Sequence, residues 1–151
     1  MNENAVSDSA CLIALAKIGH LDLLFKSFGT VTIPPAVHRE FGQNIDPLVV
    51  QSVQNTALVR SLKTQIDEGE SEAIALAMEQ ADVFVVLDDK KARRIAKQLG
   101  LKVIGTVGLL LRAKKKGIVS EIKPMLDALQ QADFRIHNGL YQEALRLAKE
   151  A

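Results

Sequence analysis

The chain has 151 residues, of which 48% are hydrophobic and 25% are charged, and its formal net charge is +1. This composition is typical of a globular protein, and the length predicts a single domain over residues 1–151. The single cysteine, Cys11, excludes a disulfide framework and a cysteine-based zinc site, and it fits a reducing, cytoplasmic location. The polar start of the chain lacks a secretory signal, and no apolar run reaches the roughly 18 residues of a membrane span.

The first half of the chain predicts short strands that alternate with short helices. Ser9 and Gly19 are suited to cap and to end the first helix, and Pro34-Pro35 is suited to open the third. In chain order, we expect a strand at 5–8, helices at 9–18 and 21–25, a strand at 31–33, a helix at 34–41, a loop at 42–47, a helix at 47–54 and an edge strand at 57–59.

The second half shows clearer periodicity. A buried stripe at helical spacing is expected from Ala73, Ile74, Ala77, Met78 and Ala81, and Thr106 is suited to cap a later helix. The expected elements are a helix at 68–80, a strand at 83–87, a helix at 90–99, a strand at 102–104, and helices at 106–116, 121–132 and 140–149. This alternation predicts an α/β fold, a three-layer α/β/α sandwich around a mostly parallel sheet.

Acidic residues directly follow two of the predicted strands. Asp8 follows Ala5-Val6-Ser7, and Asp88-Asp89 follows the apolar run 83–87. The carboxyl ends of parallel strands meet at one edge of a sheet, where sites form. Carboxylates gathered there repel one another, so a hard divalent cation or a basic partner is needed to offset them. On position alone, Asp8 is equally well a helix cap, and the acidic pair can be one cap and one solvated acid.

Three glutamates are further candidates. Glu70 lies in the first turn of the clearest helix, where the helix dipole alone explains it. Glu72 lies deeper in that helix, where burial without a partner would be costly, so we favour Glu72 for a functional role. Glu40 taken alone is a surface glutamate on the helix after Pro34-Pro35.

Basic residues fall into two groups that can form a phosphate-contacting rim, although a solvated helix face is the better explanation of any individual residue. These groups are Lys90, Lys91, Arg93, Arg94 and Lys97, and Arg112, Lys114, Lys115 and Lys116. With only 4% aromatic residues and no tryptophan, a base-stacking platform of the single-strand-binding type is not expected, and contact with nucleic acid would be through its backbone and shape. The three histidines show no metal-ligand spacing.

Four motifs, taken in order, resemble those of the PIN-domain family, and most closely its toxin-like prokaryotic branch. They are VSDS at residues 6–9, IPPAVHRE at 33–40, GESEAIALA at 69–77 and LDDKKAR at 87–93, and VIGT at 103–106 also fits that branch. PIN domains are metal-dependent nucleases, mostly ribonucleases. The resemblance therefore implies an endoribonuclease that uses Mg²⁺ or Mn²⁺.

The resemblance also assigns residues to roles. It implies catalytic roles for Asp8, Glu40, Glu72 and Asp89, and metal ligation by Asp8, Glu72, Asp88 and Asp89. The chain departs from the usual family pattern at Glu72, which is longer than the more frequent aspartate, and at Leu87, where a threonine is frequent.

The implied partners are RNA, a small antitoxin protein and a second copy of the chain, with no membrane. The apolar helical stretches 12–18 and 109–111 are candidate surfaces for a partner helix or for self-association, unless they form core.

The alternative function is a PIN-fold module that binds RNA or protein without cutting, which the leucine at position 87 favours. A phosphoacceptor receiver domain is disfavoured because it expects its acidic pair after the first strand.

Overall fold

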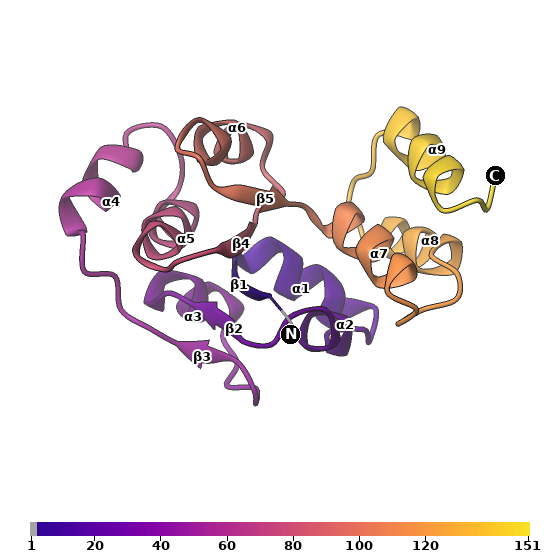
Figure 1. Ribbon diagram of the computed structural model, residues 1–151, viewed down its shortest axis with the longest axis horizontal. Helices are drawn as coiled ribbons and strands as arrows, with labels where there is room; N and C mark the ends of the chain where they lie inside the picture. The colour runs from indigo at the N-terminus through magenta and orange to yellow at the C-terminus, as the bar shows by residue number, and fades with distance from the viewer. Residues whose placement is uncertain (1–2) are drawn as a thin grey trace.

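The computed structural model, which describes residues 3–151, contains a five-stranded, all-parallel sheet in the order β3-β2-β1-β4-β5 (Figure 1). The central strand β1 is paired on both sides, with Val6 opposite Thr32 of β2 and Val85 of β4. The strands are β1 (Asn4–Ser7), β2 (Val31–Ile33), β3 (Val49–Val50), β4 (Val83–Val86) and β5 (Lys102–Ile104). This arrangement confirms the predicted fold class.

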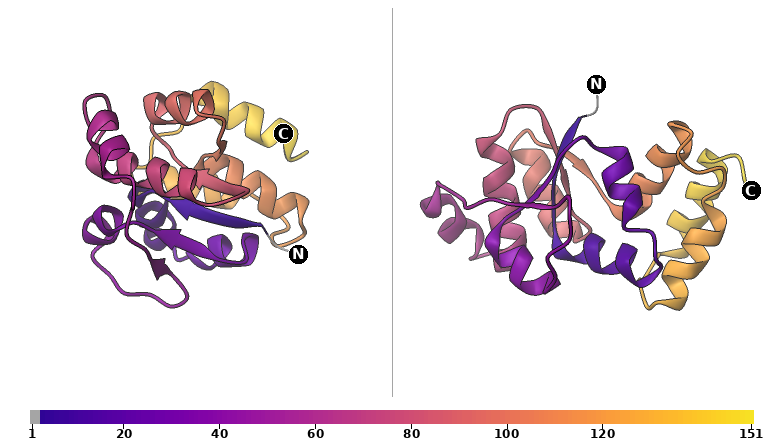
Figure 2. Two further views of the ribbon diagram at one scale, coloured as in Figure 1. Left: turned by 60° about the vertical axis from the view of Figure 1, so that its left-hand side comes forward. Right: turned by 90° about the horizontal axis from the view of Figure 1, so that it is seen from below.

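Helices cover both faces of the sheet, as Figure 2 shows. Alternate residues of β1 point to opposite layers: Ala5 packs in one hydrophobic cluster and Val6 in the other. The Ala5 cluster includes residues of α1 (Ser9–Lys17), α2 (Asp22–Ser27), α3 (Pro35–Phe41) and α7 (Thr106–Lys115). The Val6 cluster includes residues of α4 (Thr56–Leu62), α5 (Glu68–Glu79) and α6 (Lys90–Gln98).

The last two helices, α8 (Lys123–Gln131) and α9 (Asn138–Leu147), lie outside this sandwich (Figure 1). They form a third hydrophobic cluster with α1, α2 and α7, in which Leu126 and Leu129 are fully buried. The carboxylate of Glu150 holds the chain end in place, because it accepts hydrogen bonds from the backbone N–H groups of Ile122 and Lys123 and pairs with Lys114.

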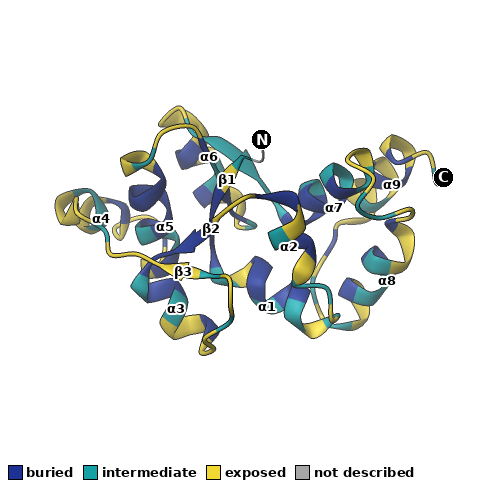
Figure 3. Cartoon of the chain, turned by 60° about the horizontal axis from the view of Figure 1, so that its bottom comes forward, coloured by how far each residue is buried: buried dark blue, intermediate teal, exposed yellow. Residues whose placement is uncertain are grey.

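Two sequence-based expectations were wrong in the segment that joins α3 to α5. The predicted helix at 47–54 is instead the short edge strand β3, because the β-branched pair Val49-Val50 pairs with β2. The predicted strand at 57–59 is instead part of α4, because the Asn55 side chain caps this helix by accepting from the N–H of Leu58 at 3.1 Å. Both valines of β3 are exposed, as Figure 3 shows for this strand.

Two predicted helix caps lie one residue from the observed ones. Asp8, not Ser9, caps α1, and Gly105, not Thr106, occupies the cap position of α7. Among residues 3–151, no helix combines the length and the apolar character that a membrane span requires.

Candidate active site

Four helices begin at the carboxyl edge of the sheet, close to the acidic residues that follow β1 and β4. Asp8 caps α1, Asp89 caps α6, Glu70 lies in the first turn of α5, and Thr106 opens α7 beside Asp88. Helix N-termini carry partial positive charge, which favours carboxylates at this edge.

Asp8 is buried, with 3% of its surface exposed. Its Oδ1 accepts a hydrogen bond from the N–H of Cys11 at 3.0 Å, and its Oδ2 accepts one from the N–H of Asp88 at 3.0 Å. Burial, followed by the charges of Asp88 and Glu70, raises the pKa of Asp8 to about 8. The fold therefore holds this carboxylate in one position while making its ionisation costly.

Asp88 is held from the opposite side by Thr106. The Thr106 backbone N–H donates to Oδ1 at 2.7 Å and its hydroxyl donates to Oδ2 at 2.6 Å. Burial raises the pKa of Asp88, although these two hydrogen bonds oppose the shift. Leu87 is fully buried in the core. The Asp88 carboxylate therefore accepts a hydroxyl hydrogen bond from α7, whereas position 87 contributes an apolar side chain to the core.

Asp89 is exposed, and its side chain accepts a hydrogen bond from the N–H of Ala92 at 2.9 Å. The two neighbouring carboxylates therefore differ: Asp88 is locked by Thr106, whereas Asp89 caps α6 at the surface. Asp89 also contributes to the raised pKa of Glu70.

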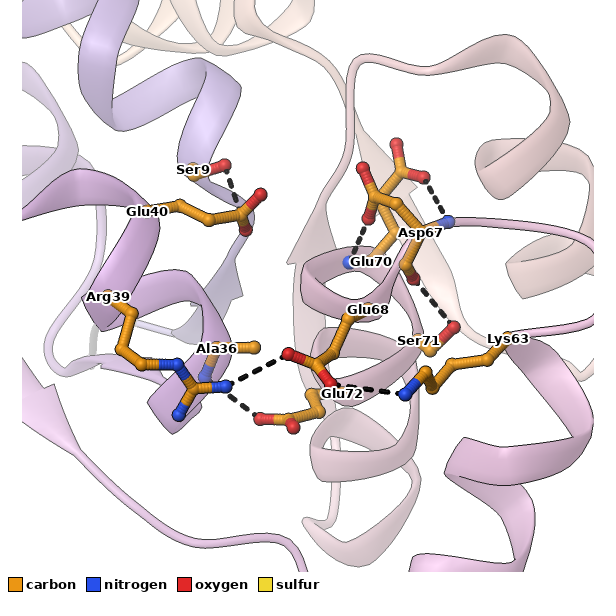
Figure 4. Close-up of polar contacts among 10 residues, drawn as sticks. All are labelled: Ser9, Ala36, Arg39, Glu40, Lys63, Asp67, Glu68, Glu70, Ser71 and Glu72. Atoms are coloured by element: carbon orange, nitrogen blue, oxygen red, sulfur yellow. Dashed lines mark hydrogen bonds and ion pairs between the residues drawn. The ribbon is translucent and has the colours of Figure 1, made fainter.

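The structure brings Glu70, rather than Glu72, to the other acids. Glu70 forms a capping box with Asp67, in which the Asp67 side chain accepts from the N–H of Glu70 at 2.8 Å. Burial, followed by the charges of Asp67 and Asp89, raises the pKa of Glu70 to about 7. Glu72 lies further along α5, and its Oε1 accepts from the N–H of Ala36 at 3.0 Å, which ties α5 to the start of α3 (Figure 4).

Glu40 extends from α3 toward the start of α5. It accepts a hydrogen bond from the Ser9 hydroxyl at 3.3 Å (Figure 4). Its Oε1 lies so close to Gly69 that a β-carbon at that position would be 2.1 Å away. Burial, followed by the charge of Asp67, raises the pKa of Glu40. The Glu40 carboxylate can therefore lie at the edge of the acidic cluster only because residue 69 is a glycine.

The two basic groups have different surroundings. In the second group, Arg112 pairs with Glu3 at 2.9 Å and lies against the rings of Phe28 and Phe84, and Lys114 pairs with Glu150. These two side chains form ion pairs that stabilise the fold, so they are not available to contact phosphates. In the first group, Arg93 lies at the edge of a cleft that Asp88 also lines.

The donors near Asp8 are all hard carboxylate oxygens, the kind that Mg²⁺ and Mn²⁺ prefer. Within residues 3–151, no three His, Cys, Asp or Glu side chains are already arranged to hold a metal ion. Burial, and after it the charges of neighbouring acids, raises the pKa of Asp8 and of Glu70, so ionised carboxylates at this edge are costly and a divalent cation would offset that cost. The chemistry of the donor set therefore fits such a cation.

Sequence reasoning missed the contributions of Glu70, Thr106 and Gly69. The pattern Asp67-x-x-Glu70 before an apolar stretch is a capping-box signature, but it does not reveal which way the second carboxylate faces. For Thr106 and Gly69, the chain offers no local signal, since their partners Asp88 and Glu40 lie far away in sequence.

Comparison with known proteins identifies the family of the chain. A family model described as a PIN domain matches residues 4–150, which is nearly the whole chain and includes α8 and α9. A search of curated proteins found no match. PIN domains are a nuclease-type family whose members typically use divalent metals, in keeping with the acidic edge of the sheet. The chain belongs to the PIN-domain family.

Proposed function

We propose that this protein is a metal-dependent endoribonuclease, and that its reaction takes place at the acidic edge of the sheet. The observation that carries the proposal is the buried, doubly hydrogen-bonded Asp8, beside Asp88 and in electrostatic contact with Glu70. A structural helix cap does not need a second, half-buried acid beside it. Mutual repulsion of this kind is typical of a site that is completed by a cation.

In this proposal Asp8, Glu70 and Asp89 hold the cation, and Asp88 positions Asp8 through its backbone N–H while Thr106 fixes its side chain. Glu70 replaces Glu72 in the ligand set that the sequence favoured, because the charge of Glu70 acts on Asp8, whereas Glu72 lies further along α5 and accepts from the N–H of Ala36. When bound, Mg²⁺ or Mn²⁺ would supply charge relief on the phosphate and a more acidic water.

Glu40 is suited to accept a proton from the attacking water. Its pKa is raised above the usual value by burial and by Asp67, which makes it a better base than a fully solvated glutamate. Its hydrogen bond from Ser9 and its contact with Gly69 keep the carboxylate at the edge of the cluster. No side chain is required to act as a nucleophile, since water attacks the phosphodiester.

The test is hydrolysis of single-stranded RNA by purified protein with Mg²⁺ or Mn²⁺, with and without EDTA. We expect cleavage that requires the metal and that Asp8→Asn abolishes. Cleavage that persists in EDTA would exclude the mechanism. Binding of RNA without cleavage under every metal condition would instead support the non-catalytic module.

We further propose that the protein is the toxin of a toxin–antitoxin pair and that it forms a homodimer in the cytoplasm. The support is the resemblance of its motifs to the toxin-like branch of the family. The apolar faces of α1 and α7 that were candidate docking surfaces are largely buried in the core, with Leu12, Leu15, Leu109 and Leu110 fully enclosed. An interface must therefore use other surfaces.

Expression of the chain alone and together with its genetic neighbour tests this second proposal. Growth arrest by the chain alone, rescue by the neighbour and a co-purifying complex are expected, with a dimer mass by light scattering. A monomer that neither slows growth nor binds the neighbouring product would exclude the toxin role and leave the nuclease proposal intact.

A further inference from the structure

A cleft of about 420 Å³ opens beside the acidic edge of the sheet, and Asp88 forms part of its wall. It lies between α6, the junction of β5 with α7, and the loop that joins α8 to α9. Its volume falls within the range of roughly 300–1,000 Å³ that is usual for small-molecule sites. Its apolar lining consists of Val103, Ile104, Val107, Leu111, Phe134 and Leu140.

Two arginines also line this apolar cleft. Arg93 comes from α6 and Arg135 from the loop between α8 and α9. Arg93 is half-buried, and its Nη1 would lie 3.4 Å from a β-carbon at position 105, which places the guanidinium beside the turn that leads into α7. The positive charge of Arg93 also acts on the Asp88 carboxylate.

Within residues 3–151, neither Arg93 nor Arg135 forms an ion pair with an acid in direct contact. The cations that form ion pairs within residues 3–151 are Lys26, Arg39, Lys63, Lys102, Arg112, Lys114, Lys123 and Arg146. Two guanidinium groups, of which Arg93 is partly balanced by the nearby Asp88, line this cleft together with apolar side chains. Such a lining is complementary to a ligand with an anionic part and a flat apolar part. The fork geometry of arginine suits the oxygens of a phosphate in particular.

We propose that this cleft binds one nucleotide of a single-stranded RNA, with the base on the apolar floor beside Phe134 and its phosphate on Arg135 and Arg93. The proposal rests on the proposed function, since Asp88 joins the cleft to the acidic cluster and so places the held nucleotide next to the phosphodiester to be cut. Contact between a base and one aromatic ring is sequence-tolerant and does not require an extended platform. The two arginines also provide positive charge that binds the substrate beside an acidic edge, which would otherwise repel the phosphates of RNA.

The cleft can be tested without catalysis. The metal-free protein is titrated with each of the four ribonucleoside 5′-monophosphates, with ribose 5-phosphate and with inorganic phosphate, and backbone amide shifts are followed by NMR. We expect low-millimolar binding of the nucleotides, with shifts at the amides of Gly105, Gly108 and Arg135, and weaker binding of the two ligands that lack a base. Absence of nucleotide shifts at these amides, or an equal response to ribose 5-phosphate, would overturn the proposal.

Substitutions then distinguish substrate binding in the cleft from the catalytic step. Arg135→Ala, at an exposed position, and Phe134→Ala should each raise the KM for single-stranded RNA on the order of tenfold and leave kcat nearly unchanged. Arg60→Ala is the matched control, because Arg60 is an exposed arginine on α4, at the opposite end of the molecule from α9 (Figure 1).

The two proposals fail in different ways. If RNA is cleaved but Arg135→Ala behaves like Arg60→Ala, the nucleotide cleft is wrong and the nuclease stands. If no RNA is cleaved by the wild-type protein, the nuclease is wrong, and the nucleotide titration still decides whether the cleft binds its ligand.

Discussion

Asp8 combines two properties that normally exclude one another, since its carboxylate is almost fully buried and faces further acids. Two backbone N–H groups stabilise the ionised form, but burial and the charge of Asp88 oppose it more strongly. An acid whose pKa is raised on folding binds its proton more tightly in the folded than in the unfolded state. Stability from this group is therefore full at low pH and is lost as the pH rises through the folded pKa.

The first prediction follows from this linkage. In EDTA, the wild-type protein should lose stability relative to Asp8→Asn as the pH rises from about 4 to about 8, the range between the ordinary and the raised pKa of Asp8. The asparagine side chain of the variant does not titrate, so the difference between the two proteins reports the ionisation of this carboxyl group together with its effect on Asp88 and Glu70. Urea unfolding at several pH values measures it, and a difference that is independent of pH would contradict the assigned shift.

The two glutamates of α5 give the second prediction. Glu70→Gln should abolish metal-dependent cleavage with little change in stability, because glutamine also serves in a capping box. Glu72→Gln is the matched control: it retains an oxygen that can accept from Ala36, so activity should persist and stability should fall by about 1 kcal/mol or less. The reverse pattern would restore Glu72 as the ligand that the sequence favoured.

At the contact between α3 and α5, the absence of a side chain at Gly69 leaves room for the carboxylate of Glu40. Close by, Arg39 and Lys63 both pair with Glu68 (Figure 4). These ion pairs are exposed and so contribute little to stability. They lie beside the cluster rather than within it, so Glu68 is not expected to bind metal.

A substitution at Gly69 gives the third prediction. Gly69→Ala should move the Glu40 carboxylate, since a β-carbon would lie 2.1 Å from its Oε1. Stability should stay within about 1 kcal/mol, because alanine favours the helix and the displaced atoms end a flexible side chain. Activity should fall to the level of Glu40→Gln. Full activity of Gly69→Ala would show that the position of Glu40 does not matter for the reaction.

On the scale of the whole molecule, the sheet brings together acids that lie up to about 80 residues apart in the chain, as in the contact between Asp8 and Asp88. Four helix N-termini point at the same edge, which offsets part of the repulsion by their dipoles. The carboxylate repulsion that the dipoles do not offset lowers the stability of the metal-free protein. A cation that binds the folded but not the unfolded chain restores this stability.

The fourth prediction concerns this linkage. Mn²⁺ or Mg²⁺ at about 100 times its dissociation constant should stabilise the protein by about 2.7 kcal/mol. For a chain of this size, each kcal/mol raises the Tm by roughly 2–4 °C. The double variant Asp8→Asn, Glu70→Gln should show no metal-dependent shift in a thermal-melt assay. An equal shift in that variant would place the binding site elsewhere.

Local sequence patterns predict much of the fold of this protein. Apolar runs ended by acids predicted β1 and β4 and the parallel sandwich, because strand burial and helix periodicity depend on neighbouring residues. The placement of Asp8, Asp88 and Asp89 at one edge followed from that topology alone. Between α3 and α5 the local signals were too weak, and pairing with β2 and the Asn55 cap decided the structure instead.

Only the tertiary structure decided which side chains face the site. Glu70 and Glu72 differ by two positions on one helix, and their roles depend on how α5 is rotated against α3, which no local pattern encodes. The same holds for Thr106, whose hydroxyl reaches Asp88 across the sheet edge, and for Arg93 and Arg112, of which one lines a cleft and the other is held by Glu3. The sequence determined the kinds of groups at the site, whereas packing between distant elements determined their directions and partners.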